Sequence, residues 1–414
     1  MKRSFADILS SLDEGRAQKV ARKLPAWAAA GTEIPSALAL EQCSSSATAD
    51  YKSLLAGQAA AAANLRFAHP SHALRRGPLP FTRPWVATGL PAAPPDPANQ
   101  DKINTILDLT GGLGVDSWAF SQVAERVVYF EQNAELAAAA ARNFAKLGAD
   151  NIEVRNETVT PETELPEADL IYADPARRSA AGRKVFLLED CTPDILTLLP
   201  MLLRKAPVVL LKLSPMADLA MLAGRLGPTL REIHVVESDG EVKELLCLLA
   251  RNAEPAEPQI IVAMLTGQFA ADVQQEGLFC FRATEEREAE AVYAAGVQAG
   301  DTLLEPCPAL LKAGAFKLPC ARWGLRKLAP STHLYLGEAA PFFKAWHVQE
   351  VLPFGAAAFR QLKRQYPRAE VTARNLPLGS DALRKKLGVA PGGDVHIFAC
   401  RLADGSAVLL VCSR

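Results

Sequence analysis

The sequence has no apolar run that approaches the roughly 18 residues a membrane-spanning helix needs, which excludes a transmembrane span. Acidic residues follow Lys2 and Arg3 within a turn or two, so no signal-peptide core forms. Cysteine pairs with the spacing Cys-x-x-Cys are missing, and the 8 cysteines are scattered along the chain. That pattern argues for reduced thiols and against a zinc cluster. We therefore expect a cytoplasmic protein that holds no metal.

Charge of one sign is not in excess over the whole chain. The 45 Lys and Arg residues stand against 46 Asp and Glu residues, a formal net charge of -1. This balance excludes a uniformly basic coat for nucleic acid. Residues 341–414 differ, because 11 Lys and Arg residues face only 5 Asp and Glu residues there, a formal net charge of +6. A basic patch is therefore expected at the C-terminal end.

The pattern of the sequence changes along its 414 residues. Ala- and Leu-rich helical spacing, with a helix expected over 53–67, gives way to a proline-rich run at 91–97 that no regular element can continue. From about residue 102, short apolar runs alternate with amphipathic helices such as 134–147. This alternation favours a parallel sheet with helices on both faces.

Several apolar runs in the middle of the chain are typical of strands. We expect strands over 103–109, 127–130, 152–155, 169–173, 208–213, 233–237 and 244–250. The last two are joined by Ser238-Asp239-Gly240-Glu241, a hairpin turn, so the parallel sheet should end in an antiparallel strand. After a weaker boundary at 252–258, we expect a strand over 260–265 and a helix over 285–293.

A glycine-rich turn follows the first of these strands. Asp108 ends the strand, Leu109-Thr110-Gly111-Gly112-Leu113-Gly114 forms the turn, and a helix is expected over 117–124. Glycines allow a ligand close to the backbone, and the start of a helix offers unpaired N–H groups. The second strand ends in Glu131, 20 positions after Gly111, where a carboxylate can accept hydrogen bonds from ribose hydroxyls. The combination predicts a nucleoside-bearing cofactor.

The residues around this turn distinguish between cofactors. A dinucleotide fingerprint, Gly-x-Gly-x-x-Gly, would have glycine where Ser117 stands. A carboxylate such as Asp108 would repel a pyrophosphate, whereas it would attract the ammonium group of a sulfonium-bearing amino acid. The chemistry therefore favours S-adenosylmethionine over NAD.

At this point the sequence resembles the class I S-adenosylmethionine-dependent methyltransferases. Asp108-Leu109-Thr110-Gly111-Gly112-Leu113-Gly114 is similar to their first motif, and Glu131 is similar to their ribose-binding acid. The resemblance implies a Rossmann-like sheet with an antiparallel last strand. It also implies a residue facing the adenine at the end of the third strand, where either Asn156 or Glu157 matches.

A second motif, Asp174-Pro175-Ala176-Arg177-Arg178, follows the fourth strand, where an open α/β sheet places its chemistry. Methyltransferases acting on amino nitrogens of nucleic acid carry Asp/Asn-Pro-Pro-aromatic at this place. This chain keeps Asp174 and Pro175 but has Ala176 and Arg177 in place of proline and the aromatic residue. Arg177 and Arg178 could bind a phosphate, stack on a base, or form surface ion pairs.

Two further clusters should border the same crevice. Lys212 ends the fifth strand among apolar residues, and it could contact a phosphate or pair with Asp174. Glu241 and Lys243 lie in the hairpin between the last two strands, and their roles stay open.

The whole chain resembles a family of methyltransferases that carry a small ferredoxin-like segment and a C-terminal THUMP-like domain. The resemblance rests on a set of motifs along the chain. They are Ala39-Leu40-Glu41-Gln42, 174–178, 212–215, 237–244, 305–312, 374–377, 383–388 and Gly392-Gly393. THUMP domains bind RNA, commonly tRNA, and the local charge of +6 suits such a partner.

We therefore predict an N-terminal helical region and linker over 1–98 and an S-adenosylmethionine-binding domain over 99–255. A ferredoxin-like domain over 256–338 and a THUMP-like RNA-binding domain over 339–414 would follow. The resemblance implies methylation of RNA, either tRNA or rRNA, and the apolar run lengths and cysteine spacing predict that no membrane and no metal are involved. The alternatives are a methyltransferase for a small molecule or protein, and a non-catalytic RNA-binding protein on the same fold.

The site residues expected from this resemblance form two groups. Those for the acceptor are Asp174, Arg177, Arg178 and Lys212, and those for the cofactor are Asp108, Thr110, Gly111, Gly112, Gly114, Glu131, Asn156 and Glu157.

Overall fold

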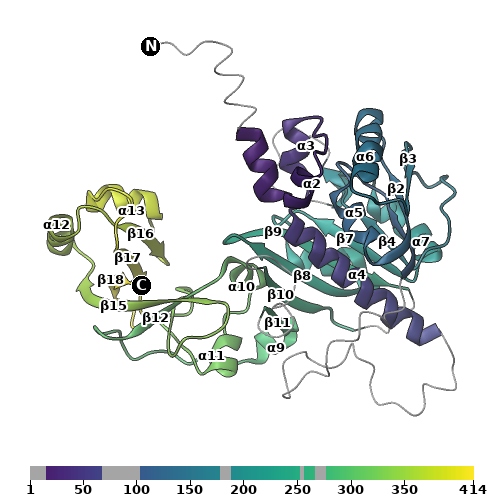
Figure 1. The fold of residues 1–414 in the computed structure, drawn as a ribbon. Helices are drawn as coiled ribbons and strands as arrows, with labels where there is room; N and C mark the ends of the chain where they lie inside the picture. The colour runs from purple at the N-terminus through teal and green to yellow at the C-terminus, as the bar shows by residue number, and fades with distance from the viewer. Residues whose placement is uncertain (1–14, 68–102, 178–187, 252–255, 266–276) are drawn as a thin grey trace, which may run out of the picture. The chain divides into compact units, whose positions relative to one another are not determined.

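The structure is a computed structural model that describes residues 15–67, 103–177, 188–251, 256–265 and 277–414 (Figure 1). The proline-rich run at 91–97 and Arg178 lie outside these ranges. The chain divides into two compact units, Met1–Cys280 and Phe281–Arg414. Within the described residues, no helix is both long enough and apolar enough to cross a membrane.

A nine-stranded sheet forms the centre of the first unit (Figure 1). Its strands are β1 (Ile103–Asp108), β2 (Ala124–Phe130), β3 (Ile152–Arg155), β4 (Leu170–Ala173), β7 (Val208–Leu213), β8 (Leu230–Ser238), β9 (Glu241–Ala250), β10 (Gln259–Leu265) and β11 (Leu278–Phe281). Their order is β11-β10-β8-β9-β7-β4-β1-β2-β3. Strands β1, β2, β3, β4 and β7 pair in parallel, and β9 is antiparallel to both of its neighbours. The predicted parallel sheet with an antiparallel strand is confirmed.

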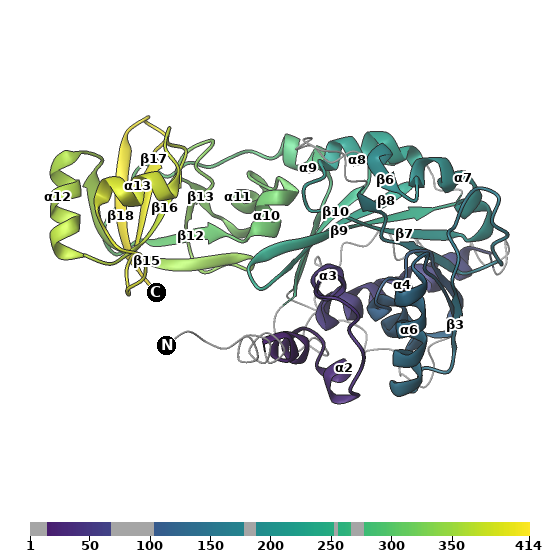
Figure 2. The same ribbon diagram turned by 90° about the horizontal axis from the view of Figure 1, so that it is seen from above.

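Helices cover both faces of this sheet, as the alternation of the sequence predicts (Figure 2). The helices of the first unit are α2 (Pro25–Ala29), α3 (Ala37–Gln42), α4 (Ser46–Phe67), α5 (Val115–Ser121), α6 (Ala134–Lys146), α7 (Ile195–Lys205) and α8 (Leu219–Leu226), and short 3-10 turns lie at Leu188–Asp190 and Gly227–Thr229. Helices α4 and α6 lie on one face, and α7 and α8 lie on the other (Figure 2). A separate two-stranded ribbon joins β5 (Ala176–Arg177) to β6 (Cys191–Thr192).

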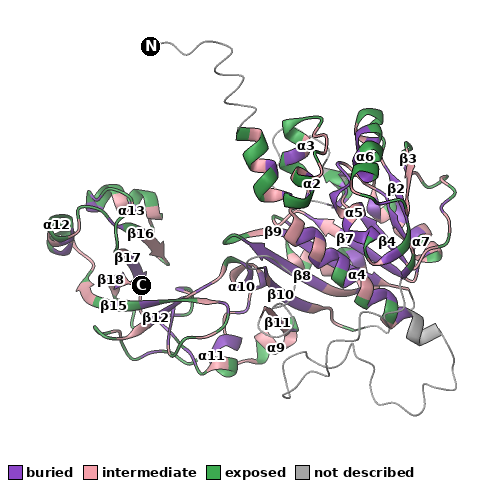
Figure 3. Cartoon of the chain, in the orientation of Figure 1, coloured by how far each residue is buried: buried purple, intermediate pink, exposed green. Residues whose placement is uncertain are grey.

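Helix α4 is part of the core of the first unit, although it precedes every strand in the chain. Tyr51, Leu55 and Ala59 of α4 pack in one hydrophobic cluster with Ile106 of β1 and Leu246 of β9. Most residues of β1, β7 and β8 are buried (Figure 3). The N-terminal helices and the sheet therefore fold as one unit.

One helix and one domain boundary expected near the sheet differ from the structure. The helix expected over 117–124 spans Val115–Ser121, because Ala124 already pairs with Ile103 as the start of β2. The sheet also continues past the domain boundary expected at residue 255, since β10 pairs in parallel with β8 along its whole length.

The second unit is built on a seven-stranded sheet of order β13-β14-β12-β15-β18-β17-β16. Its strands are β12 (Thr302–Pro306), β13 (Arg326–Lys327), β14 (Tyr335–Leu336), β15 (Phe343–Pro353), β16 (Glu370–Arg374), β17 (His396–Arg401) and β18 (Ala407–Ser413). Its helices are α9 (Ala283–Glu288), α10 (Pro308–Ala313), α11 (Leu318–Trp323), α12 (Ala356–Gln365) and α13 (Ser380–Leu387).

The helix expected over 285–293 is wrong beyond Glu288, where α9 ends. The residues that follow pair with β13 instead, because Lys327 N donates to Val292 O (2.7 Å) and Ala294 N donates to Lys327 O (2.9 Å). Pairing with a neighbouring strand has thus overridden the helix propensity of this Glu- and Ala-rich stretch.

Candidate active site

The glycine turn after β1 is shaped by two aromatic rings. A Cβ atom on Gly111 would lie 2.0 Å from Cε2 of Tyr129, so only glycine fits at this position. Gly114 has φ 93°, and a Cβ atom there would lie 2.6 Å from Cζ of Phe144. Strand β2 and helix α6 supply these rings, so the turn is pressed tightly against its neighbours.

Glu131 lies against this turn, as its expected role requires. Its carboxylate accepts hydrogen bonds from Gly112 N (2.9 Å) and from Asn133 N (2.7 Å). Nδ2 of Asn156 donates to Glu131 O (2.7 Å), so the ends of β2 and β3 are joined at this point. Glu157 is exposed beside it. The structure therefore brings Glu131, Asn156 and the glycine turn together.

Asp108 ends β1 with a side chain that is only 1% exposed. Its carboxylate accepts hydrogen bonds from Thr110 N (3.1 Å) and from the hydroxyl of Ser117 (2.5 Å). Burial raises the pKa of Asp108 to about 7, and the nearby charges of Asp116 and Asp174 act in the same direction. A cation that arrived beside Asp108 would favour its ionised form.

Asp174 is tied to the same turn and to β7. Its backbone N–H donates to the hydroxyl of Thr110 (2.6 Å), and its carboxylate forms an ion pair with Lys212. Strands β4 and β7 are parallel neighbours, so their carboxyl ends meet at one edge of the sheet. Of the two roles expected for Lys212, the structure shows the pairing with Asp174.

Lys212 keeps its proton in this environment. Burial alone would lower its pKa, but the carboxylates of Asp174, Glu244 and Asp116 together raise the pKa well above its ordinary value. Lys212 is therefore an ammonium group that fixes Asp174, and it cannot serve as a general base.

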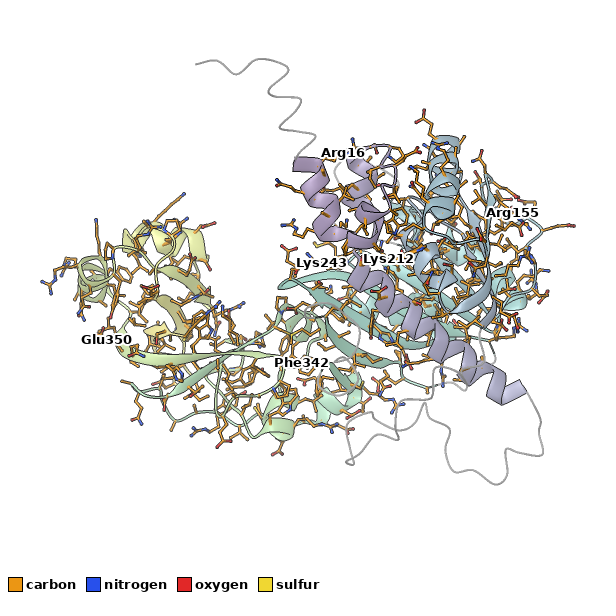
Figure 4. All side chains as sticks on the ribbon, in the orientation of Figure 1. Arg16, Arg155, Lys212, Lys243, Phe342 and Glu350 are labelled. Carbon is orange, nitrogen blue, oxygen red and sulfur yellow. The ribbon has the colours of Figure 1, made fainter. Side chains whose placement is uncertain are left out.

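The structure describes only part of the remaining expected site residues. The backbone of Arg177 belongs to β5 and pairs with Cys191 of β6, while its side chain and all of Arg178 lie outside the described residues. Lys243, which is labelled with Lys212 in Figure 4, forms an ion pair with Glu241 (2.9 Å) on the hairpin between β8 and β9.

A buried lysine from α4 completes the site, and sequence reasoning missed it. Lys52 is fully buried, and its ammonium group lies 3.0 Å from Glu244 and 3.1 Å from Asp116. It also donates to the hydroxyl of Ser44 (2.7 Å), and Ser44 in turn donates to Asp116 (2.9 Å). Tyr172 of β4 donates to the same carboxylate (2.8 Å). This network links α4, α5, β4 and β9.

The charges of the site carry a net negative balance. The carboxylates of Asp108, Asp116, Asp174 and Glu244 interact with one another and with the ammonium groups of Lys52 and Lys212. With all four acids ionised, four carboxylates against two ammonium groups leave an excess of negative charge, which suits a cationic ligand. Burial raises the pKa of Asp108 and of Glu244, so this excess grows as the pH rises. Among the described residues, no group of His, Cys, Asp or Glu side chains could hold a metal ion.

The strand order, with β9 inserted antiparallel between β7 and β8 and a glycine turn after β1, defines the fold of a class I methyltransferase. Two family models match the second unit. A ferredoxin-like domain matches residues 303–342, and a THUMP domain-like model matches residues 343–414.

Relatives in sequence and structure match most of the chain. The crystal structure of a candidate methyltransferase from Porphyromonas gingivalis W83 is 31% identical, covers 96% of this chain and 88% of its own, and superposes with a TM-score of 0.74. Two proteins of Mycobacterium tuberculosis, from strains CDC 1551 / Oshkosh and H37Rv, are each named an uncharacterized S-adenosylmethionine-dependent methyltransferase. Each is 27% identical over 303 residues, or 72% of this chain and 78% of the relative. The chain belongs to the family of S-adenosylmethionine-dependent methyltransferases that carry a ferredoxin-like and a THUMP-like domain.

Proposed function

We propose that the chain binds S-adenosylmethionine at the carboxyl ends of β1 and β2 and transfers its methyl group to RNA, with tRNA as the first substrate to test. The observation that carries the cofactor assignment is the glycine turn with carboxylates and an excess of negative charge around it. The RNA assignment is supported by the THUMP domain-like match over residues 343–414 and by the formal charge of +6 over residues 341–414.

The residues around the turn fit the cofactor chemically. Glu131 would accept hydrogen bonds from the ribose hydroxyls, and Gly111, Gly112 and Gly114 would let the nucleoside approach the backbone. Asp108 would face the positively charged amino acid part. Asn156 or Glu157 would contact the adenine. Nδ2 of Asn156 is already bonded to Glu131 O, so Asn156 would offer its oxygen.

The second half of the site would hold the acceptor. When bound, the cofactor supplies a methyl group on a sulfonium centre, so the protein has to position the acceptor and exclude water. Lys212 and Thr110 fix Asp174, whose carboxylate would accept a hydrogen bond from the acceptor nucleotide. Arg177 and Arg178 follow Asp174 directly in the chain and would contact a phosphate or stack on a base.

The RNA assignment can be tested in cells and in vitro. Modified nucleosides of tRNA and rRNA would be compared by mass spectrometry between cells with and without the gene. We expect one methylated nucleoside to be lost, and purified protein with S-adenosylmethionine to restore it on RNA from the deficient cells. Unchanged nucleosides in both RNA classes would contradict RNA as the substrate and would favour a small molecule or a protein.

Asp174→Asn should separate acceptor binding from cofactor binding. A hydrogen bond to a charged group contributes about 1.5–3 kcal/mol, so methyl transfer to RNA from the gene-deficient cells should fall by about 10- to 100-fold. Affinity for S-adenosylmethionine should stay within a few-fold of wild type. Glu131→Gln is the matched control, because it should weaken cofactor binding instead. Wild-type turnover by Asp174→Asn would remove this residue from the site.

A further inference from the structure

Residues 343–414 place two helices side by side on one face of their sheet. Strand β15 is antiparallel to β18, β18 is antiparallel to β17, and β17 is parallel to β16, so β15, β16 and β17 run in one direction. Helices α12 and α13 are the crossovers between these strands, and both pack on one hydrophobic cluster through Leu362, Leu383 and Leu387. The two helices therefore run parallel, and their C-terminal ends lie at the same end of the sheet.

Contacts between the helices confirm that these ends meet. Lys363 of α12 lies beside Gly388, the residue that ends α13, where an added Cβ atom would be 3.2 Å from Nζ of Lys363. Nζ of Lys386 lies 5.6 Å from the ring centroid of Phe359 on α12.

Exposed cations lie along α12 and at the ends of both helices. They are Arg360, Lys363 and Arg364 of α12, Arg368 of the loop after it, and Lys385 and Lys386 of α13, and we call them the α12–α13 basic surface. Across the described residues 277–414, none of these six forms an ion pair with a carboxylate within 4.0 Å.

Other cations of the same region already have partners. Arg374 pairs with Glu305 (3.2 Å), and Arg384 pairs with Asp381 (3.1 Å). Arg401 donates to Gly405 O (2.6 Å), and Lys344 lies 4.1 Å from the ring centroid of Trp346. The +6 charge of the C-terminal region is therefore available to a partner mainly at the α12–α13 basic surface.

The helix dipole explains only part of this arrangement. The negative end of a helix favours cations in its last turn. For each helix considered alone, this effect accounts for Lys363 and Arg364 of α12 and for Lys385 and Lys386 of α13. The helix dipole does not account for Arg368, which lies beyond α12. It also does not explain why the C-terminal ends of α12 and α13 lie next to each other. The exposed carbonyl groups at these ends would repel phosphate, so side chains alone would have to contact it.

We infer that the α12–α13 basic surface binds the phosphate backbone of RNA without reading its sequence. This inference rests on the proposed function, because RNA has to be a ligand of the chain. The surface would add affinity and orient the RNA, while the choice of nucleotide would depend on other contacts.

The test compares two triple variants of the full-length chain. Lys363→Gln, Lys385→Gln and Lys386→Gln remove three charges from the surface. Arg22→Gln, Arg204→Gln and Arg326→Gln form the matched control, because they remove three exposed positive charges elsewhere. Binding of fluorescein-labelled unfractionated tRNA would be measured by anisotropy between about 50 and 300 mM KCl. Circular dichroism would check that both variants are folded.

We expect the slope of log Kd against log[KCl] to fall by about 2 in the surface variant, since each phosphate contact contributes about 0.7–0.9. Affinity near 0.1 M salt should fall on the order of 100-fold, while the control variant stays near wild type. Equal losses of tRNA affinity in both variants, or no loss in the surface variant, would contradict phosphate binding by the α12–α13 basic surface but leave RNA as a ligand.

Two further outcomes would overturn the inference for other reasons. Failure of the wild-type chain to bind tRNA at any of these salt concentrations would reject RNA as a ligand, and the proposed function would fail with it. Binding of poly-glutamate as tight as that of tRNA, lost in the surface variant, would assign the surface to an acidic protein.

Discussion

Replacing Lys52 with methionine should lower the free energy of unfolding by about 3–5 kcal/mol, because it leaves buried carboxylates without their cation. Glu244 is 3% exposed and lies 3.0 Å from the lysine, and Asp116 lies 3.1 Å from it. Lys205→Met is the matched control, because Lys205 is partly exposed and pairs with the exposed Glu167 at 3.2 Å. The control should cost less than about 1 kcal/mol. Urea denaturation measures both.

The loss in Lys52→Met should also depend on pH. Burial already raises the pKa of Glu244, and without Lys52 this pKa should rise further. An acid with a raised pKa in the folded state holds its proton more tightly there than in the unfolded chain. The destabilisation should therefore be smallest near pH 4 and grow as the pH rises. The double variant with Glu244→Leu should recover much of the loss. A pH-independent loss of less than 1 kcal/mol would show that the network is not structural.

Asp108→Ala should weaken binding of S-adenosylmethionine by about 100-fold, the effect of losing a hydrogen-bonded charge. Ser117→Ala is the control for a purely structural role, because it removes a hydroxyl that donates to Asp108 and keeps the charge. We expect Ser117→Ala to lose less than about tenfold. Isothermal titration calorimetry measures both affinities. Equal losses in the two variants would show that Asp108 acts by maintaining the conformation of the turn and not by its charge.

The pKa of Asp108 gives this prediction a second readout. Burial raises that pKa to about 7, so the carboxylate is mostly protonated at pH 6 and mostly ionised at pH 8. Cation binding requires the ionised form, so wild-type affinity relative to Asp108→Asn should rise about tenfold between these pH values. Asp108→Asn should show only the titration of the ligand itself. The same pH profile in both proteins would contradict the role of this charge.

Eight strands of the nine-stranded sheet could be predicted because each is a short apolar run bounded by polar residues, whereas β11 was not predicted. The glycine turn could be located for a similar reason, since Gly111 and Gly114 interrupt an otherwise apolar stretch. The cause of these glycines could not be predicted, because Tyr129 and Phe144 meet them only in the folded chain. The helix expected over 285–293 failed for the same kind of reason, since its second half pairs with β13.

Topology predicted that Asp174 and Lys212 lie close together, because parallel neighbours end at the same edge of a sheet, but it left open whether Lys212 pairs with Asp174 or contacts a phosphate. Lys52 was missed, although the sequence holds a signal for it. It shares a helical stripe with Ala56, Ala59 and Ala63, all of which are buried. A lysine on the buried stripe of a helix needs a partner charge, but Glu244 lies 192 residues away in the chain. Only the folded structure identifies that partner.

The central claim is that the charge of Asp108 makes the site bind S-adenosylmethionine and not NAD. Calorimetric titration of the wild-type chain with each of the two ligands tests this claim most directly. We expect saturable binding of S-adenosylmethionine at one site and no heat of binding with NAD. Binding of NAD, or failure to bind S-adenosylmethionine near pH 8 where Asp108 is ionised, would contradict it.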